Sequence, residues 1–511
     1  MTEAADRVFT NAVVHSLDGT EETAEAVAVR NGRVVRVDSA YEVDFLAGVE
    51  TDIVDLGERH LLPGFVDAHT HMDLLGRRLL EADLTGADSP RECRERLRNV
   101  EVDHRDVDWI LGFGYDESRW GGDYLDRADL DSVSEDRPVA AFREDLHLAS
   151  VNSVALERHH EEMPEGDVRT AGGEPTGVLV EGAVAAIFEA TRPGPGPMRA
   201  YLLAAQDHAH GRGVTAVHDM VRRSAAPRVY RDLEAAGELS LRVRINYWAD
   251  HLEAVREVGL ASNHGGDRVR VGAIKTYIDG SIGGRTARLS EPYADADSGR
   301  GDLLESREAL AELVEGADAT GLQLALHAIG DEAIGVALDA LEGTDGERHR
   351  IEHAEVLTDD LIERLGDSTV VVSAQPNFLK WAREDGLYDD RLGRERRRDS
   401  NRLGALQAAG ADLAFGSDCM PMDPLFGIQK VVTAPQPAQR LPVTDAIRAY
   451  TLGAARAGFD ESRMGTVEPG KYADFVVLED SPWEVPDDEI ADVDVTATVV
   501  GGEVVHDVRG E

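Results

Sequence analysis

Two histidines one residue apart are the first feature of this chain that could do chemistry. They end the segment GFVDAHTH at 64–71, which is largely apolar until it reaches them. Side chains alternate between the two faces of a β-strand, so His69 and His71 point the same way. Two neutral imidazoles that converge are typical of the beginning of a metal site. Two histidines with a purely structural role would give the same local pattern. The rest of the sequence must therefore decide between a metal site and a structural role.

Residues able to serve a metal site recur at the ends of other strand-like runs. RVGAIK ends on Lys275, LQLALH on His327, RIEH on His353 and LAFGSD on Asp418. Barrel enzymes place their catalytic groups at the carboxyl ends of their strands. In the alternative reading the histidines are satisfied core residues and Asp418 caps a helix, which requires several unrelated coincidences. We therefore expect these side chains to meet in one metal site.

The elements that must position these residues are strands of a parallel sheet. Short apolar runs alternate with helical stretches over most of the chain, a pattern typical of α/β proteins. Eight runs qualify as strands, the number that a (β/α)8 barrel needs. They are 65–71, 213–218, 241–246, 269–275, 322–327, 349–353, 370–374 and 412–418. The predicted fold class is therefore α/β, with a (β/α)8 TIM barrel that carries the candidate ligands at its carboxyl end.

The segments outside the barrel strands predict two further parts. Both ends of the chain alternate apolar and polar residues, with a hairpin signal at Asn31-Gly32, so we expect them to pair into one small composite β-sandwich. The stretch after the first strand is too long for one connection and predicts an insertion domain. The expected organisation is 1–62 (sandwich, first part), 63–80 (barrel strand 1), 81–200 (insertion domain), 201–464 (rest of the barrel) and 465–511 (sandwich, second part).

The net charge of the chain restricts the kinds of molecule that its surface can bind. Its 98 acidic and 53 basic residues give a formal net charge of −45. Such a surface repels nucleic acid and anionic lipid, so we expect no nucleic-acid and no membrane partner. It resembles the surface of halophilic proteins, where salt screens the repulsion. Cys93 and Cys419 are too few for a disulfide framework and the N-terminus lacks a signal-peptide pattern, so we expect a cytoplasmic protein.

The ordered set of candidate ligands resembles the amidohydrolase superfamily of metal-dependent hydrolases, and the resemblance covers nearly the whole chain. More narrowly, KTYIDGSIGGRTA at 275–287 with Glu291-Pro292-Tyr293 is similar to the YtcJ-like, amidohydrolase-3 branch, as are segments 145–156 and 175–179. Leu146 departs from the glycine expected there. The resemblance implies hydrolysis of a non-peptide carbon–nitrogen bond in a small-molecule amide-type substrate, such as an N-formyl or N-acyl compound.

Lysine at position 275 points to chemistry that arginine cannot perform. The chain has four lysines, so nearly all of its cations are arginines. An ammonium group has no lone pair and would repel a metal ion. Addition of CO2 to the neutral amine would give a carbamate, whose two oxygens can bridge two metals. We therefore expect a CO2-derived carbamate on Lys275, with an ion pair to Asp279 or to another acidic residue as the alternative.

Together these residues predict a two-metal hydrolase with zinc as the favoured metal, because the ligands are nitrogen and oxygen. The predicted ligands are His69, His71 and Asp418 for one ion, His327 and His353 for the second, and the Lys275 carbamate with a hydroxide for both. Asp418 is expected to act on the attacking water as general base and on the leaving amine as general acid. His218, which ends the run GVTAVH, is expected to donate a hydrogen bond to the substrate oxyanion.

Three other functions stay open at this point. A mononuclear deaminase would use the histidines and the aspartate without the lysine. A cyclic-amide hydrolase shares the lysine but lacks this insertion, and a non-catalytic metal-binding barrel would keep the ligands and lose turnover. A homodimer is the default assembly. Side chains that could line a substrate pocket are His147, Asp279, Arg285, Trp381 and Met420.

Overall fold

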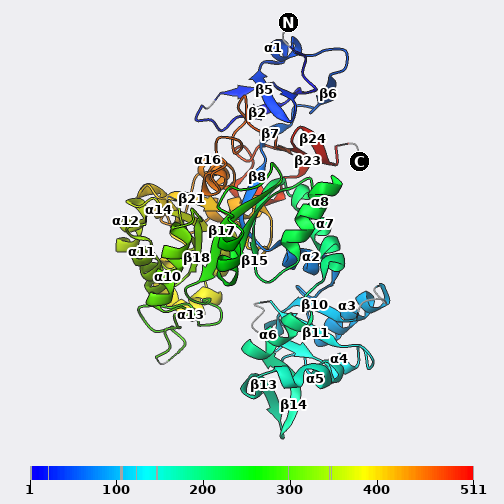
Figure 1. Cartoon of the computed structure of the whole chain (residues 1–511), viewed down its shortest axis with the longest axis vertical. Coiled ribbons are helices and arrows are strands. Elements are labelled where there is room, and N and C mark those ends of the chain that lie inside the picture. The colour runs from blue at the N-terminus through cyan, green and yellow to red at the C-terminus, as the bar shows by residue number, and fades with distance from the viewer. Residues whose placement is uncertain are drawn as a thin grey trace. The chain divides into compact units, whose positions relative to one another are not determined.

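One compact unit of the protein, which spans residues 1–72, 206–223 and 227–511, contains a parallel β-barrel (Figure 1). The computed structural model describes residues 3–20, 22–103, 108–121, 123–144, 148–296, 298–344, 346 and 348–509. The barrel strands are β8 (Phe65–Thr70), β15 (Val214–Val221), β16 (Arg242–Trp248), β17 (Val269–Tyr277), β18 (Leu324–Ala328), β19 (Arg350–His353), β20 (Val371–Ala374) and β21 (Asp412–Phe415). They pair in this order, each parallel to its neighbour. The predicted (β/α)8 barrel is confirmed.

The first and last strands are joined by the residues that follow β21. The amide of Asp418 donates to the carbonyl oxygen of His69 at 2.7 Å, and the amide of Ser417 donates to the carboxylate of Asp67 at 2.9 Å. Gly416 permits this approach, because a Cβ atom there would lie 2.3 Å from the amide nitrogen of His69. The ends of β8 and β21 that carry candidate ligands are thus held next to each other.

Helices follow the strands and cover the outside of the barrel. They include α8 (Ala226–Ala236), α9 (Leu252–Glu257), α10 (Arg307–Asp318), α11 (Asp331–Leu341), α12 (Asp359–Gly366), α13 (Leu387–Arg398), α14 (Leu403–Ala408), α15 (Pro424–Val432), α16 (Val443–Arg448) and α17 (Ala454–Ala457). Figure 1 shows α10, α11 and α12 along the outer side of the barrel. In α11 the buried residues Ile334, Leu338 and Leu341 recur every three to four positions, which gives one apolar stripe. None of the helices in the described ranges is both long and apolar enough to cross a membrane.

The two ends of the chain form a composite β-sandwich, as predicted. Its strands are β1 (Arg7–Thr10), β2 (Val13–His15), β3 (Thr23–Ala24), β4 (Ala26–Arg30), β5 (Arg33–Asp38), β6 (Asp52–Asp55), β7 (His60–Pro63), β22 (Phe475–Leu478), β23 (Val495–Val500) and β24 (Glu503–Asp507). One sheet has the order β5-β4-β1-β6 and the other β24-β23-β22-β7-β2-β3. The rings of Phe9 and Phe475 meet edge to face at 5.6 Å in the shared core. Neither end could bury its apolar face without the other.

The insertion forms a second compact unit, which spans residues 73–205 with 224–226 and is therefore wider than the expected 81–200. Its sheet has the order β13-β14-β12-β11-β10-β9, with strands β9 (Ala82–Asp83), β10 (Ile110–Tyr115), β11 (Val139–Arg143), β12 (Leu148–Val151), β13 (Val168–Ala171) and β14 (Glu174–Val180). Its helices include α2 (Met72–Leu80), α3 (Pro90–Asp103), α4 (Arg127–Asp131), α5 (Ser153–His159) and α6 (Glu181–Ala190), and α7 (Pro195–Gly211) leads back to the barrel. The rings of Phe113 and Phe142 stack at 4.8 Å in its core.

Candidate metal centre

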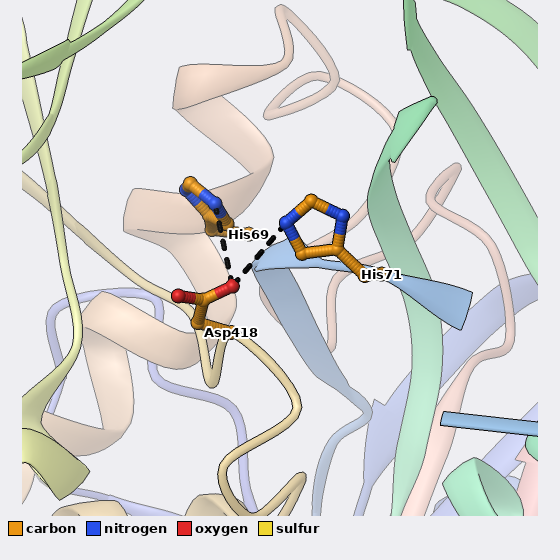
Figure 2. A group of neighbouring side chains, drawn as sticks. All are labelled: His69, His71 and Asp418. Carbon is orange, nitrogen blue, oxygen red and sulfur yellow. Dashed lines mark ion pairs between the residues drawn. The ribbon is translucent and has the colours of Figure 1, made fainter. Parts of the chain in front are cut away.

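Three side chains at the carboxyl end of the barrel form one ligand group (Figure 2). Nε2 of His69 lies 3.7 Å and Nε2 of His71 lies 3.4 Å from Oδ1 of Asp418. One ligand atom from each residue lies within 4.8 Å of the other two. In a tetrahedral zinc site two ligand atoms about 2 Å from the ion are separated by roughly 3.3 Å, so small side-chain adjustments suffice for one cation to contact all three. The strand alternation expected for the two histidines thus holds.

The second nitrogen of each imidazole is held by a hydrogen-bond acceptor. Nδ1 of His69 lies 2.6 Å from Oε2 of Glu352, and Nδ1 of His71 lies 3.1 Å from the carbonyl oxygen of Met220. A carboxylate and a carbonyl can only accept, so Nδ1 of each neutral ring donates and carries the proton. The lone pair of each Nε2 then points to the side of Asp418, as a metal ligand requires.

Asp418 is positioned by a turn that Asp67 organises. The buried carboxylate of Asp67 accepts hydrogen bonds from the amide and the hydroxyl of Ser417 and from the amide of His69. Burial raises the pKa of Asp67 to about 6, although these hydrogen bonds oppose the shift. Asp418 and Cys419 have φ angles of 52° and 51°, in the left-handed region that is costly for such residues. The strained turn directs the Asp418 carboxylate at the two imidazoles.

His327 and His353 extend the group in a continuous row of rings. The ring centroids of His69 and His353 are 4.8 Å apart, and those of His353 and His327 are 4.4 Å apart. Nδ1 of His353 is buried and has no hydrogen-bond partner among the described residues, whereas Nε2 of His327 donates to the carbonyl oxygen of Gly280 at 3.0 Å. Burial lowers the pKa of His327 to about 3, and that of His353 falls well below its usual value. Both rings are therefore neutral and retain a lone pair for a metal.

Lys275 lies on β17, near enough for its charge to lower the pKa of His69, His327 and His353. Its side chain is 1% exposed, and its Nζ atom has no hydrogen-bond partner in the parts of the chain that the structure describes. Burial lowers the pKa of this amine to about 8, although Glu352 and Asp418 favour the charged form. A buried amine without a partner is costly. The surroundings of this amine fit a side chain that binds a metal or adds CO2. The alternative, an ion pair with Asp279, does not occur among the described residues.

Glu352 is a central residue that the sequence analysis missed. Strand alternation places Glu352 and His353 on opposite faces, yet both reach His69. The reason is the left-handed backbone of His353, whose φ of 74° turns its ring back to the barrel interior. Arg350 forms two hydrogen bonds to the Glu352 carboxylate, at 2.7 and 3.0 Å. Burial alone would raise the pKa of Glu352, but Arg350 and Lys275 outweigh it and the pKa is lowered. In the sequence, the only sign of this role is that the acidic Glu352 directly precedes the predicted ligand His353.

His218 lies within its strand and not at the end, where the sequence pattern had indicated it. Its hydrogen bond to a substrate oxyanion stays a prediction. β15 continues from His218 to Val221, and Nη1 of Arg350 donates to Nδ1 of His218 at 2.8 Å. Nη2 of the same guanidinium also donates to the carbonyl oxygen of Ala68 at 2.6 Å. Arg350 therefore bridges Glu352 and His218, and His218 belongs to a polar layer on the side of Arg350 opposite to Glu352. These contacts give no support to a role in binding a substrate oxyanion.

The candidate pocket residues have mainly structural contacts. Asp279 accepts hydrogen bonds from the amides of Ile329, Gly330 and Arg288, which pins the loop after β17, and burial raises its pKa to about 7. Arg285 forms an exposed ion pair with Asp295. The carbonyl oxygen of Met420 accepts hydrogen bonds from Asn377 and Lys380. His147 lies outside the described residues.

Aromatic side chains contact two rings of the row of histidines, His327 and His353. The ring of Tyr277 lies 4.7 Å from that of His327, and the ring of Trp248 lies 4.7 Å from that of Tyr277. The ring of Phe378 stacks on that of His353 at 6.1 Å, and the ring of Trp381 lies 4.6 Å from that of Phe378. Tyr277 and Trp381 are partly exposed. These rings form an apolar border around the polar centre.

Comparisons with known proteins agree with this geometry. The model of a family described as the amidohydrolase family matches residues 52–506. YtcJ of Bacillus subtilis (strain 168) is 32% identical over 94% of this chain and 96% of its own length. The N-substituted formamide deformylase of Arthrobacter pascens is 24% identical over 100% of both chains. The crystal structure of an uncharacterized metal-dependent hydrolase from Pyrococcus furiosus superimposes with a TM-score of 0.81 and 31% identity, covering 94% of this chain and 100% of that one.

Proposed function

The chain belongs to the amidohydrolase family, and we propose that it hydrolyses a non-peptide carbon–nitrogen bond of an N-formyl or N-acyl compound with the help of divalent metal. The observation that carries this proposal is the convergence of two oriented Nε2 atoms and the Asp418 carboxylate beside the unbonded Lys275 amine. The name of the Arthrobacter relative supports this bond type. A purely structural cluster would not leave the Lys275 amine buried without a hydrogen bond.

The residues of this chain divide the work of hydrolysis. His69, His71 and Asp418 would hold a divalent ion, which would supply Lewis-acid chemistry for the substrate carbonyl and for activating water. Asp418 takes a proton from the attacking water as its oxygen bonds to the carbonyl carbon. The same carboxyl group then gives that proton to the nitrogen as the carbon–nitrogen bond breaks, so the products are a carboxylic acid and an amine. Glu352 and the Met220 carbonyl keep the two imidazoles in the required tautomer.

The proposal also includes a second metal position. His327 and His353 would hold that ion, and a carbamate on Lys275 would lie between the two positions. The neutral amine is the form that adds CO2, and the lowered pKa of about 8 makes this form accessible near neutral pH. A crystal structure with electron density for a carboxyl group on Nζ and two metals per chain is the expected result. One metal and a bare amine would favour the mononuclear deaminase reading instead.

The flanking rings suggest which substituent the substrate carries. The ring of Tyr277 contacts His327, the ring of Trp381 contacts Phe378, which stacks on His353, and both Tyr277 and Trp381 are partly exposed. Aromatic faces contact apolar and aromatic groups favourably. We therefore expect an amide whose nitrogen or acyl group bears an aromatic or other large apolar substituent.

The test is an assay of metal-loaded protein at high salt against a matched panel. The panel pairs N-formyl with N-acetyl amines and aromatic with short aliphatic substituents, and metal is counted per chain. We expect hydrolysis in the presence of metal, its loss after chelation, and preference for the aromatic members. Turnover that survives complete metal removal would contradict the proposal, and preference for the aliphatic members would contradict the inferred substituent.

A further inference from the structure

A second polar cluster lines a small cavity at the amino end of the barrel, away from the candidate metal centre. The cavity has a volume of about 20 Å³, enough for one water molecule or one monatomic ion. The residues around it include those at the starts of β15, β16 and β17. Five arginines line it: Arg242, Arg244, Arg268, Arg270 and Arg463.

The carboxylates nearby do not balance these arginines. Asp474 is used by Arg242, which it binds through two hydrogen bonds of 2.6 and 2.9 Å. Asp460 alone serves Arg244 at 2.8 Å, Arg463, and more distantly Arg270 at 3.8 Å. The third carboxylate, Asp267, accepts a hydrogen bond from the hydroxyl of Tyr472. The lining of the cavity thus holds five guanidinium groups and two carboxylates, Asp267 and Asp460. Asp474 is bound to Arg242, and Glu461, which also acts on Arg244, is paired with Arg348. Guanidinium groups therefore outnumber carboxylates here, in a chain whose net charge is −45.

Arg244 has a buried hydrogen-bond donor that no described residue of the cluster accepts. Its side chain is 3% exposed, and its Nε–H has no hydrogen-bond partner among the residues described. Nη2 donates to Asn263 and Asp460, both at 2.8 Å. The backbone of Gly458 packs closely on this side chain, because a Cβ atom there would lie only 2.7 Å from Nε of Arg244 and 2.9 Å from Nε2 of His218. Burial and the neighbouring Arg270 lower the pKa of Arg244 to about 9, which shows how poorly its charge is compensated.

We propose that this cavity binds one small monovalent anion, such as chloride, between Arg244, Arg270 and Arg463. An anion would accept the Nε–H hydrogen bond of Arg244 and neutralise part of the excess charge. A volume of about 20 Å³ matches a single monatomic ion. A water molecule would accept the hydrogen bond but leave the charge uncompensated. Because the anion binds the folded chain, it would stabilise that chain against unfolding in proportion to its occupancy.

Bromide provides a direct test, because it replaces chloride and scatters anomalously. Crystals of the full chain grown or soaked in sodium bromide should show an anomalous peak in the cavity, within hydrogen-bond distance of Nε of Arg244. The peak should vanish in Arg244→Gln and weaken in Arg270→Gln. Bromide found only on the surface, an adventitious ion only, or a water in the cavity at molar bromide would overturn the proposal.

A solution measurement covers the case in which Arg244→Gln fails to fold. At equal ionic strength, the wild-type midpoint of thermal unfolding should be higher in potassium chloride than in potassium gluconate, whose anion is too large for the cavity. This difference should shrink in Arg270→Gln. It should persist in the matched control Arg228→Gln, which removes an arginine that is 75% exposed on α8. Equal differences in the two variants would reject the site.

Discussion

The two ends of the barrel hold polar clusters of opposite character. At the carboxyl end lie four histidines, Asp418 and Lys275, and burial lowers the pKa of three of the imidazoles, those of His69, His327 and His353. At the amino end, guanidinium groups outnumber carboxylates. Each end contains a buried nitrogen without a hydrogen-bond partner among the described residues, Nζ of Lys275 in one case and Nε of Arg244 in the other.

This contrast indicates which sign of ion each cluster could bind, because residue type determines whether a cluster offers lone pairs or hydrogen-bond donors. Neutral imidazoles and carboxylates have lone pairs, so they can bind a cation, and a lysine can be made neutral by burial. A guanidinium has only donors and stays charged, so it can be completed only by an acceptor. Between the two clusters Arg350 binds Glu352 on one side and His218 on the other. This buried ion pair separates the region of neutral bases from the region of cations.

Asp418→Asn should have the largest effect at the carboxyl end. The amide keeps the size of the side chain but cannot accept the proton from water, so turnover should fall roughly 10³- to 10⁴-fold. Metal content should stay close to that of the wild type. The matched control Asp359→Asn alters a carboxylate that is 91% exposed on α12 and should leave turnover unchanged. Steady-state kinetics with metal analysis measures both, and normal turnover of Asp418→Asn would reject its role.

Lys275→Met should lower the metal content from two ions per chain to one. Methionine fills a similar volume but cannot form a carbamate, so the bridge between the two positions is lost. Lys430→Met, which removes a lysine whose Nζ lies over the Phe426 ring, is the control and should retain both ions. Elemental analysis after gel filtration distinguishes them. A metal content that is the same in the two variants would show that the amine at 275 does not serve the metals.

Glu352→Gln should weaken metal binding about 10- to 100-fold, the usual effect of losing an acidic partner of a ligand histidine. The amide can no longer hold Nδ1 of His69 as a charged acceptor, and Arg350 loses the charge that neutralises it. Competition with a chelator of known affinity measures the change. The control is Glu363→Gln, an exposed residue of α12. An unchanged affinity in Glu352→Gln would mean that His69 is oriented without it.

His210→Gln should have its effect on stability rather than on activity, since this residue lies at the amino end. Nδ1 of His210 donates to the Val214 carbonyl and Nε2 contacts Ser240, and burial lowers its pKa to about 4. An unfolded histidine titrates near 6.5. The unfolded chain therefore binds more protons between about pH 6.5 and 4, and the free energy of unfolding falls as the pH drops through this window.

The loss attributable to His210 is about 2 kcal/mol at pH 5. His210→Gln should remove that part of the acid sensitivity, as measured by denaturant unfolding at pH 7.5 and 5. The exposed His264 supplies the control variant His264→Gln. If both variants lose stability on acidification as steeply as the wild type, His210 does not contribute to the pH dependence.

Features that depend on local sequence pattern were predicted well. The alternation around His69 and His71 and the eight apolar runs follow from strand geometry, which acts over a few residues. The pairing of the two chain ends was predicted because each end has one apolar face to bury. The strand boundary at His218 was wrong, since an apolar run does not show where hydrogen bonding to neighbouring strands stops.

Features that depend on several strands at once were not predicted. Glu352 and Arg350 act through partners more than a hundred residues away, and the arginines around the amino-end cavity come from separate strands and from the segment after α17. The insertion also extends beyond 81–200, because its edges are set by packing rather than by composition.

The linear chain thus contained the identity and order of the metal-ligand side chains, because a residue's chemistry and strand alternation are local properties. Closure of the barrel decided which of those side chains meet, which imidazole nitrogen each acceptor holds, and which nitrogens stay buried without a partner. The left-handed backbone at His353 and Asp418 is an example of a feature that only the folded structure determines. Such costly backbone conformations persist only where surrounding contacts impose them, and those contacts exist only in the folded protein.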